Sequence, residues 1–422
     1  MKKIFLLILT AALALPSASV LGYEQYIKIG LYFASGSKDS ITLTSPSGFT
    51  IGHGEDAGFA RAYDMAETEI IVSKGAGGGF LINGMQFDTA GDMSVKPILG
   101  NIGIGGVNYR GFALLRRMTD SDMTVINVVG LEEYLYSVVG REMSPSWNIE
   151  ALKAQAVCAR TYAMTHMNKY QKYGFNLCNT QNSQVYSGIG AESESTIRAV
   201  NETAGQTVRY GGKTVEVFYF SSGGGSTEDS KNVWSGDLPY LKSVADPYEN
   251  PSEATKYHWT ETITREALER KIPDVGRIQY IEIVSRAPSG RVTELRVVGD
   301  AGTKTAVREG VRGLIGYDIL SSQQFTIAGG APVLADGTAL QSGAAVLGGD
   351  GVSTLGGDVS VLGGYNQTDY SLTKFYGDSF TFVGRGWGHS VGMSQWGAKA
   401  MADSGFTYTD ILKFYFTGVE VY

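Results

Sequence analysis

Few side chains in this sequence combine the type and the spacing that catalysis or metal binding requires. No GxxxxGK(S/T) phosphate loop and no GxSxG nucleophile elbow is present. The histidines are scattered and none stands in an HExxH pattern: His53, His166, His258 and His389. The sequence therefore lacks the signatures of nucleotide-binding loops, serine hydrolases and zinc proteases.

The two cysteines, Cys158 and Cys178, allow several uses. Their number excludes a disulfide-rich scaffold and a four-cysteine zinc site. Cys158 stands among alanines in a helical stretch, which indicates a buried small side chain. A disulfide between the two, a Cys–His nucleophile pair and a zinc site built from scattered histidines and cysteines remain alternatives.

Glu142 is the carboxyl group with the most suggestive position. It follows Gly140-Arg141 and precedes a helix rich in small residues. At such a junction the side chain can be half-buried against Trp147 or Met143, and burial would raise its pKa toward neutrality, which suits a general acid. The alternative is a carboxylate that caps a helix or interacts with its dipole.

The elements around Glu142 are predicted to form the centre of the fold. Residues 124–129 are a buried-strand candidate, and residues 131–139 a short helix that starts with Glu132 and Glu133. An Ala-rich helix is expected from residue 149 to about residue 170. It places Gln155 and Tyr162, seven residues apart, on one face.

The remaining pattern is mostly β. Residues 23–110 read as a β-rich accessory domain with strands at 26–32 and 40–44. Two strands at 207–210 and 215–220 are expected to form a hairpin, followed by a flexible loop at 221–226. A helix at 262–271 and strands at 278–284 and 293–298 suggest an inserted α+β subdomain at 262–327.

The rest of the chain divides into three segments. Residues 328–368 are rich in glycine and are expected to be a linker with short β-turns. The catalytic domain is expected to comprise residues 111–261 and 369–422. Residues 1–22 hold two lysines, an apolar run and then small residues, which is typical of a secretory signal or a retained membrane anchor. We therefore expect an extracytoplasmic protein.

Composition agrees with a globular α+β protein of several domains. The chain has 422 residues, 43% of them apolar, and 56 glycines. Lys plus Arg is 35 and Asp plus Glu is 42, so the net charge is −7. This acidic balance argues against nucleic acid as a partner.

Four stretches resemble a known family. They are EEYLYSVVGREMSPSWNIEALKAQAVCARTYA at 132–163, NTQNSQVYSG at 179–188, VFYFSSGGGSTEDSKNVW at 217–234 and GRGWGHSVGMSQWGAKAMA at 384–402. Together they resemble the stage II sporulation protein D and amidase-enhancer family, over about residues 118–243 and 380–422. The resemblance implies a peptidoglycan lytic transglycosylase that acts on glycan strands stripped of their stem peptides by a partner amidase.

The resemblance assigns the catalytic role to Glu142. A lytic transglycosylase can use one carboxyl group, which first protonates the glycosidic oxygen and then takes the proton of the muramic 6-hydroxyl as a 1,6-anhydro ring closes. The resemblance also suggests glycan-contacting or supporting residues, each with packing in the core as its alternative: Gln155, Arg160, Tyr162, Gln184, Tyr186, Ser221, Ser222, Gly223, Gly224, Glu228, His389 and Gln395. Trp387 and Trp396 are expected either to stack on sugars or to lie in the core.

Three positions depart from the family pattern. Some members bind zinc through a His and a Cys where this chain has Asn182-Ser183, so no metal and no organic cofactor are expected. Phe220 replaces a histidine, and Ser390 replaces a glycine that often follows His389. Two non-enzymatic alternatives remain: a glycan-binding module that recruits or stimulates an amidase, and a structural wall protein. A role in sporulation and one in vegetative growth are equally compatible with the sequence.

Overall fold

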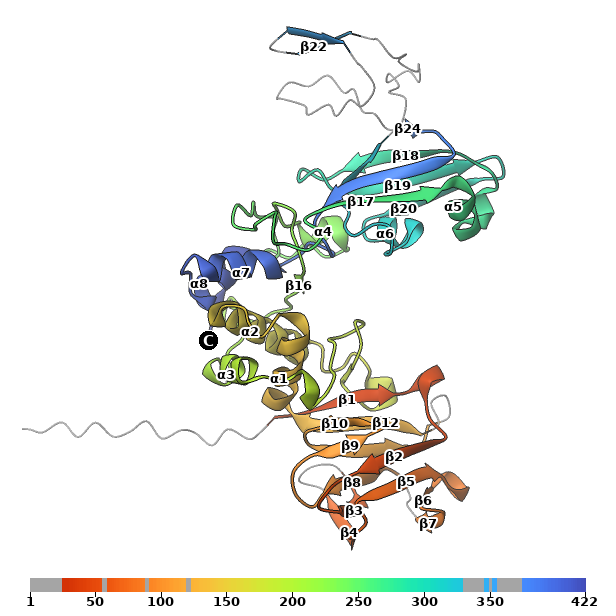
Figure 1. Ribbon diagram of the computed structural model, residues 1–422, viewed down its shortest axis with the longest axis vertical. Helices are drawn as coiled ribbons and strands as arrows, with labels where there is room; N and C mark the ends of the chain where they lie inside the picture. Colours follow the sequence, from red (N-terminus) through yellow and green to blue (C-terminus); the bar gives the residue numbers. More distant parts are fainter. Residues whose placement is uncertain are drawn as a thin grey trace, which may run out of the picture.

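A computed structural model describes residues 25–54, 59–87, 91–118, 123–328 and 374–422, and the backbone of residues 345–348 and 351–354. The expected signal or anchor at residues 1–22 and most of the Gly-rich insert lie outside the described residues. Figure 1 shows three parts along the long axis: a β-rich N-terminal part, a helical middle part and a second β-rich part. The structure confirms the expected α+β class.

The N-terminal part contains two antiparallel-rich sheets. Their strand orders are β13-β1-β12-β11-β8-β3-β4 and β10-β9-β2-β5-β6-β7. The bounds are β1 Tyr26–Tyr32, β2 Ser40–Thr44, β3 Phe49–His53, β4 Ala60–Met65, β5 Glu69–Lys74, β6 Phe80–Ile82, β7 Met85–Phe87, β8 Met93–Pro97, β9 Ile102–Ile104, β10 Val107–Tyr109, β11 Phe112–Arg116, β12 Thr124–Gly130 and β13 Leu177–Cys178, with short 3-10 turns η1 Ala34–Gly36 and η3 Ala76–Gly78.

The sheet does not end at the domain boundary expected near residue 110. Strands β11 and β12 pair with each other and join β8 to β1, so residues 112–130 complete the N-terminal sheet. Every residue of β12 is buried, as expected for a strand covered on both faces. Because β12 leads directly into α1, and Leu131 N–H donates to Gln25 O at 2.7 Å, the sheet fixes where α1 begins.

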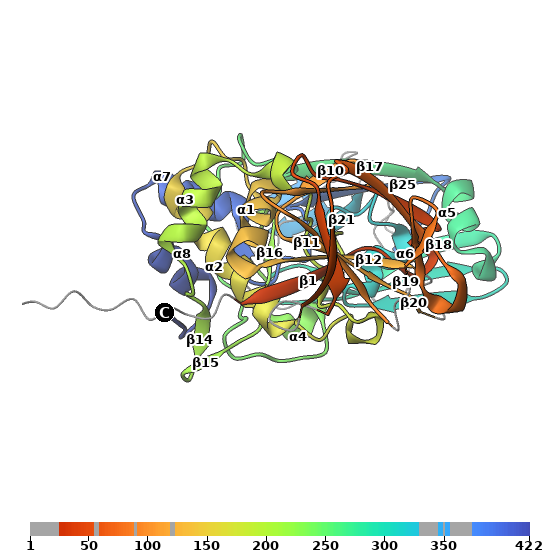
Figure 2. The ribbon, with the colours of Figure 1, turned by 90° about the horizontal axis from the view of Figure 1, so that it is seen from below.

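The middle part is a cluster of helices. Its bounds are α1 Leu131–Glu142, α2 Ile149–Thr165, α3 Glu194–Glu202, α4 Ser230–Val233, α7 Gln395–Asp403 and α8 Tyr408–Tyr415, with 3-10 turns η4 Gln171–Tyr173 and η5 Ile189–Ala191 and short strands β14 Val208–Tyr210, β15 Lys213–Thr214, β16 Tyr219–Phe220, β26 Met393–Ser394 and β27 Glu420–Val421. Helix α2 contacts α1, α3, α7 and α8 and is buried from Ala154 to Ala163. Its small residues allow this close approach from several sides. Figure 2 shows α1, α2, α3, α7 and α8 gathered to one side of the molecule.

Two local expectations need correction. Helix α2 ends at Thr165 rather than near residue 170, because His166 leaves the helical conformation and its backbone N–H caps Tyr162 O and Ala163 O. The expected hairpin at 207–220 is also shorter, since only β14 and β15 pair. The following strand, β16, instead pairs in parallel with β26 from the C-terminal region.

The second β-rich part has its own hydrophobic core. Its bounds are β17 His258–Thr264, α5 Arg265–Lys271, η6 Pro273–Val275, β18 Ile278–Arg286, β19 Val292–Gly299, β20 Thr303–Val307, α6 Gly310–Ile315, β21 Phe325–Ala328, β24 Lys374–Phe375 and β25 Ser379–Arg385. The strand orders are β17-β25-β21 and β20-β19-β18-β24. Phe375, Phe380 and Phe382 lie in this core, so residues 374–385 belong to this part and not to the catalytic domain as expected.

The Gly-rich insert leaves this part between β21 and β24. Within it, β22 Ala345–Gly348 and β23 Gly351–Thr354 pair as an antiparallel hairpin. Among the residues that the structure describes, no helix is both long and apolar enough to cross a membrane.

Candidate functional site

Glu142 is the last residue of α1, and its half-buried carboxyl group meets a helix that begins 253 residues later in the chain. Gln395, the first residue of α7, donates from its Nε2 to Glu142 Oε2 at 3.2 Å. Ser394 fixes the start of α7, because its hydroxyl accepts the backbone N–H of Gly397 at 3.2 Å. The N-cap of α7 therefore aims the Gln395 amide at the carboxyl group.

A second donor reaches Glu142 from β16. The Tyr219 hydroxyl lies beside the Glu142 carboxyl group and favours its charged form. Burial raises the pKa of Glu142 above its ordinary value, while the bonds from Gln395 and Tyr219 and the charge of Arg141 partly counteract this effect. The site thus favours a protonated acid and also holds two groups that stabilise its carboxylate.

Glutamine side chains support both donors. Gln184 Nε2 donates to the Tyr219 hydroxyl at 3.0 Å, and the Tyr134 hydroxyl donates to Gln184 Oε1 at 3.2 Å. On the other side, Gln395 Nε2 lies 3.4 Å from Gln155 Oε1. Gln184 and Gln155 are buried, so these contacts restrict the positions of Tyr219 and Gln395. The sequence-predicted residues Gln155, Gln184 and Gln395 therefore do converge on Glu142.

The loop after β16 is buried and held in place, which corrects the expectation of a flexible loop. Ser221 O accepts the backbone N–H of Trp396 at 3.1 Å. Ser222 and Trp387 exchange two backbone hydrogen bonds, of 3.1 and 2.8 Å. Gly223 and Gly224 are buried behind this bridge. These four loop residues therefore flank the start of α7 and do not contact Glu142 through a side-chain hydrogen bond.

Arg160 and Tyr162 serve other parts of α2. The guanidinium of Arg160 is buried and makes a bidentate ion pair with Glu132, with N···O distances of 2.7 and 2.6 Å. Tyr162 stacks on His166, with ring centroids 4.0 Å apart. Arg160 thus secures α2 against α1, whereas Tyr162 packs on the C-terminal end of α2 itself.

Tyr186 and Glu228 are also engaged within the protein. The Tyr186 hydroxyl donates to Asn127 Oδ1 at 2.8 Å in the N-terminal sheet. Glu228 is buried, and its carboxylate accepts from Asp229 N, Asn232 Nδ2 and the Ser289 hydroxyl.

His389 supports the site through the backbone. Its ring lies among Phe218, Phe220 and Trp234, and its Nδ1 accepts the N–H of Val391 at 3.1 Å. The ring also hydrogen-bonds to the backbone of Tyr219. Burial lowers the pKa of His389 to about 4, so the ring is neutral at ordinary pH and donates its other N–H.

Two aromatic groups lie close to the start of α7. Trp396 packs against Trp147 with ring centroids 4.8 Å apart, and both rings are half-buried. Trp387 is 41% exposed, with the Lys256 ammonium group 5.6 Å from its ring centroid. An exposed indole of this kind offers a face on which a sugar ring can stack.

Two important residues carried no signal that would have identified them. Tyr219 was visible in the Phe-Tyr-Phe stretch, but only the pairing of β16 with β26 brings it to Glu142. Glu249 was missed altogether: it lies in an irregular segment, and its carboxylate Oε2 accepts the backbone N–H groups of Gly223 and Gly224 at 2.9 and 3.1 Å.

Both thiols are free and buried, so the structure does not contain the disulfide that the sequence left open. Hydroxyl groups of Tyr170, Thr180 and Ser183 surround Cys178. Burial opposes ionisation of Cys178, but these hydrogen bonds together lower the pKa of its thiol. Hydroxyls are not the imidazole or thiolate ligands that structural zinc requires, so this position does not fit zinc. No group of three or more His, Cys, Asp or Glu side chains suited to a metal occurs within the described ranges.

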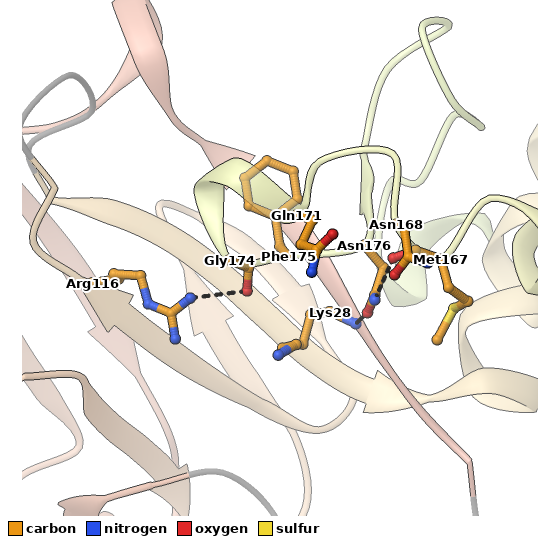
Figure 3. Close-up of a pocket in the computed structure, with 8 residues that line it drawn as sticks. All are labelled: Lys28, Arg116, Met167, Asn168, Gln171, Gly174, Phe175 and Asn176. Atoms are coloured by element: carbon orange, nitrogen blue, oxygen red, sulfur yellow. Dashed lines mark hydrogen bonds between the residues drawn. The ribbon is translucent and has the colours of Figure 1, made fainter.

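Two pockets of the described structure are not lined by Glu142. Figure 3 shows one of about 250 Å³ between the N-terminal sheet and the loop after α2, where Arg116 donates to Gly174 O at 3.1 Å. In this pocket the side chain of Asn176 accepts from Lys28 N and donates to Met167 O, both at 2.7 Å. A second pocket, of about 400 Å³, is lined by polar and basic residues between α4 and the second β-rich part. Each pocket is lined by residues from segments far apart in the sequence.

Fold and site define an α+β protein in which a glycine-rich central segment and a glycine-rich C-terminal segment hold a half-buried acid at the end of a short helix. The family model for the Stage II sporulation protein matches residues 119–210, and one for a domain of unknown function (DUF8618) matches residues 248–343. The chain belongs to the stage II sporulation protein D family.

Individual relatives agree with this assignment. An uncharacterised protein of Brachyspira hyodysenteriae is 30% identical over 323 residues, which are 75% of this chain and 73% of the relative. The stage II sporulation protein D of Bacillus subtilis is 29% identical over 308 residues, 69% of this chain and 74% of that protein. The amidase enhancer of Bacillus subtilis is 32% identical over 312 residues, 68% of this chain and 40% of that protein.

Proposed function

We propose that this protein is a peptidoglycan lytic transglycosylase that uses Glu142 as both acid and base. The observation that carries the proposal is the environment of this one carboxyl group. Burial raises the pKa of Glu142 and so favours the protonated acid, while Gln395 and Tyr219 can stabilise the carboxylate that forms when the proton leaves. A group that must donate a proton and then accept one needs both features.

The reaction follows from this environment. Glu142 donates its proton to the oxygen between N-acetylmuramic acid and N-acetylglucosamine, and the bond from muramic C1 to that oxygen breaks. The Glu142 carboxylate then takes the proton of the muramic 6-hydroxyl. The 6-oxygen bonds to C1 and closes the 1,6-anhydro ring, which returns Glu142 to its protonated form. Because water is not the nucleophile, the reaction requires no second carboxylate, in contrast to hydrolysis of glycosides.

The setting of the reaction is part of the proposal. The names of the relatives mention sporulation and amidase enhancement, which suggests that the chain works in the cell wall beside an amidase. The expected signal or anchor at residues 1–22 suggests a location outside the cytoplasm. The preferred substrate is then glycan from which the amidase has removed the stem peptides.

The test is mass spectrometry of products from amidase-treated glycan strands, with wild type, Glu142→Gln and Glu133→Gln. Glu133 is a carboxylate in the first turn of the same helix, so it is a matched control. We expect 1,6-anhydro ends from wild type and Glu133→Gln. Glu142→Gln should lose at least about 100-fold in rate, the range that acid–base groups contribute.

Other products would change the assignment. Hydrated reducing ends would show a hydrolase. If neither wild type nor variants cleave stripped or intact glycan, the same proteins should be added to a purified wall amidase. Faster release of stem peptides would then favour the alternative, a glycan-binding module that stimulates the amidase.

A further inference from the structure

Glu249 is a buried carboxyl group that is not one of the two partners of Glu142, which are Gln395 and Tyr219. Its side chain is 4% exposed. One oxygen, Oε2, accepts the N–H groups of Gly223 and Gly224 at 2.9 and 3.1 Å. The other oxygen, Oε1, and the hydroxyl of the buried Ser222 have no hydrogen-bond partner in the described part of the chain. The hydrogen bonds of the Glu249 carboxyl group therefore go to the backbone of the loop 221–225.

The opposite side of the loop is held by Arg291. Its guanidinium donates to Gly223 O at 2.8 Å, and to Ser226 O at 2.6 Å. Because Glu249 takes the loop N–H groups and Arg291 takes its carbonyl groups, the loop is fixed from both sides. Close packing leaves little room to move, since a Cβ on Gly224 would approach Gly386 N within 2.7 Å.

The loop connects directly to both partners of Glu142. Its N-terminal end continues from β16, which carries Tyr219. Its first carbonyl, Ser221 O, accepts from Trp396 N at 3.1 Å and from the Ser394 hydroxyl at 3.4 Å. Ser394 and Trp396 are the residues on either side of Gln395, so the loop position sets the position of both groups that contact Glu142.

We propose that Glu249 is a positioning residue for the proposed reaction: it fixes the loop 221–225 through the Gly223 and Gly224 amides, and the loop holds Tyr219 and Gln395 against Glu142. This inference rests on the proposed function for its catalytic consequence. Its structural part, the anchoring of the loop, stands on the contacts alone.

The charge of Glu249 is not required for this role. Burial, with a smaller contribution from Asp246, raises the pKa of Glu249 to about 7 against the opposing influence of Ser222 and of the N–H groups of Gly223 and Gly224. Both protonation states are therefore present near neutral pH, and a carbonyl oxygen can accept the two loop N–H groups in either state. A glutamine at this position should consequently preserve the function.

The experiment compares Glu249→Ala and Glu249→Gln in the full chain, with Glu253→Ala as a control. Glu253 is a nearby carboxylate whose side chain is 50% exposed. Amide hydrogen exchange should show at least about tenfold faster exchange over residues 221–225 and 394–397 in Glu249→Ala and no change in the other two proteins. With stripped glycan, kcat of Glu249→Ala should fall at least about tenfold with KM little changed. Glu249→Gln should keep kcat within about threefold of wild type.

The two parts of the test fail separately. Unchanged exchange in a folded Glu249→Ala overturns the inference whether or not the protein cleaves glycan. If Glu249→Gln loses as much kcat as Glu249→Ala, the inference is also wrong, because its acceptor should suffice. If wild type does not cleave glycan but Glu249→Ala exchanges faster in both segments, the proposed function fails while the anchoring role holds.

Discussion

At the scale of single residues, opposing influences act on the pKa of Glu142. Burial favours the protonated form, and the bonds from Gln395 and Tyr219 favour the carboxylate. A surface carboxylate would have given up its proton near pH 4.5 and would lack one to donate at neutral pH. A buried carboxyl group without donors would resist ionisation in the first step. The observed site lies between these limits, which suits a residue that is acid and base in turn.

This balance predicts a pH effect. Glu142 must be protonated to act as the acid, and its pKa is raised. Consequently, kcat/KM should fall as pH rises through that pKa and the proton is lost. Tyr219→Phe removes a donor to the carboxylate, so it should raise the pKa of Glu142 further and move the alkaline limb to higher pH. The same variant should lower kcat by about tenfold or more, since the carboxylate is less stabilised.

The measurement is the pH dependence of anhydro-product formation for both proteins. Tyr136→Phe is the control, because Tyr136 lies on the same helix as Glu142 and its hydroxyl bonds to Asn201 instead. A limb that stays in place in Tyr219→Phe would contradict the assigned contact.

At the scale of secondary structure, the position of α7 decides whether Gln395 can reach Glu142. Helix α7 packs against α2 and α8, and Gly397 lies at the tightest point. A Cβ built on Gly397 would overlap the Tyr415 hydroxyl and the carboxylate of Asp246. These two groups are themselves hydrogen-bonded at 2.6 Å, so neither is free to withdraw. Glycine at this position is therefore a requirement of close approach.

The prediction at this scale is that Gly397→Ala destabilises the protein by about 1–3 kcal/mol, as overpacking usually does. Gly310→Ala in α6 is the matched control, because nothing lies within 4 Å of a Cβ there. Helix propensity alone should make that control neutral or more stable by up to about 1 kcal/mol. Urea unfolding followed by circular dichroism measures both, and equal effects of the two substitutions would refute the packing argument.

At the scale of the whole molecule, Arg291 connects two parts that have separate hydrophobic cores. One core joins the N-terminal sheets and the helices, and the other fills the second β-rich part. Arg291 crosses between them: it lies in the turn before β19, and its buried guanidinium donates to the loop carbonyls of Gly223, Ser226 and Thr227. The second β-rich part therefore supports the site from a distance.

Arg291→Met should uncouple the two cores. The substitution leaves buried carbonyl groups without donors, and each such loss amounts to about 1–3 kcal/mol. We expect the two parts to unfold in chemical denaturant at midpoints that lie further apart than in wild type. We also expect a lower kcat. Lys304→Met, at an exposed position of the same part, is the control. A variant that unfolds like wild type would show that Arg291 does not couple the cores.

Much of the local structure could be predicted from the sequence because it depends on short-range pattern. The alternation at residues 40–44 predicted β2 with its observed bounds, and the apolar run at 124–129 predicted β12. The Ala-rich stretch predicted α2 apart from its last turn, and the pattern at residues 131–139 predicted α1, which the structure extends by three residues to Glu142. Local propensity and burial pattern suffice for these features, since the interactions that specify them lie within a few residues.

The tertiary structure alone decided which side chains meet. Gln155 and Arg160 lie five residues apart on α2, and sequence pattern could not distinguish their roles. Gln155 reaches the site, whereas Arg160 pairs with Glu132. Only the parallel pairing of β16 with β26 brings Tyr219 and Gln395 to Glu142. Likewise, Glu249 contacts the loop because an irregular segment folds back on it. Long-range packing sets these distances, and no period or spacing along the chain encodes them.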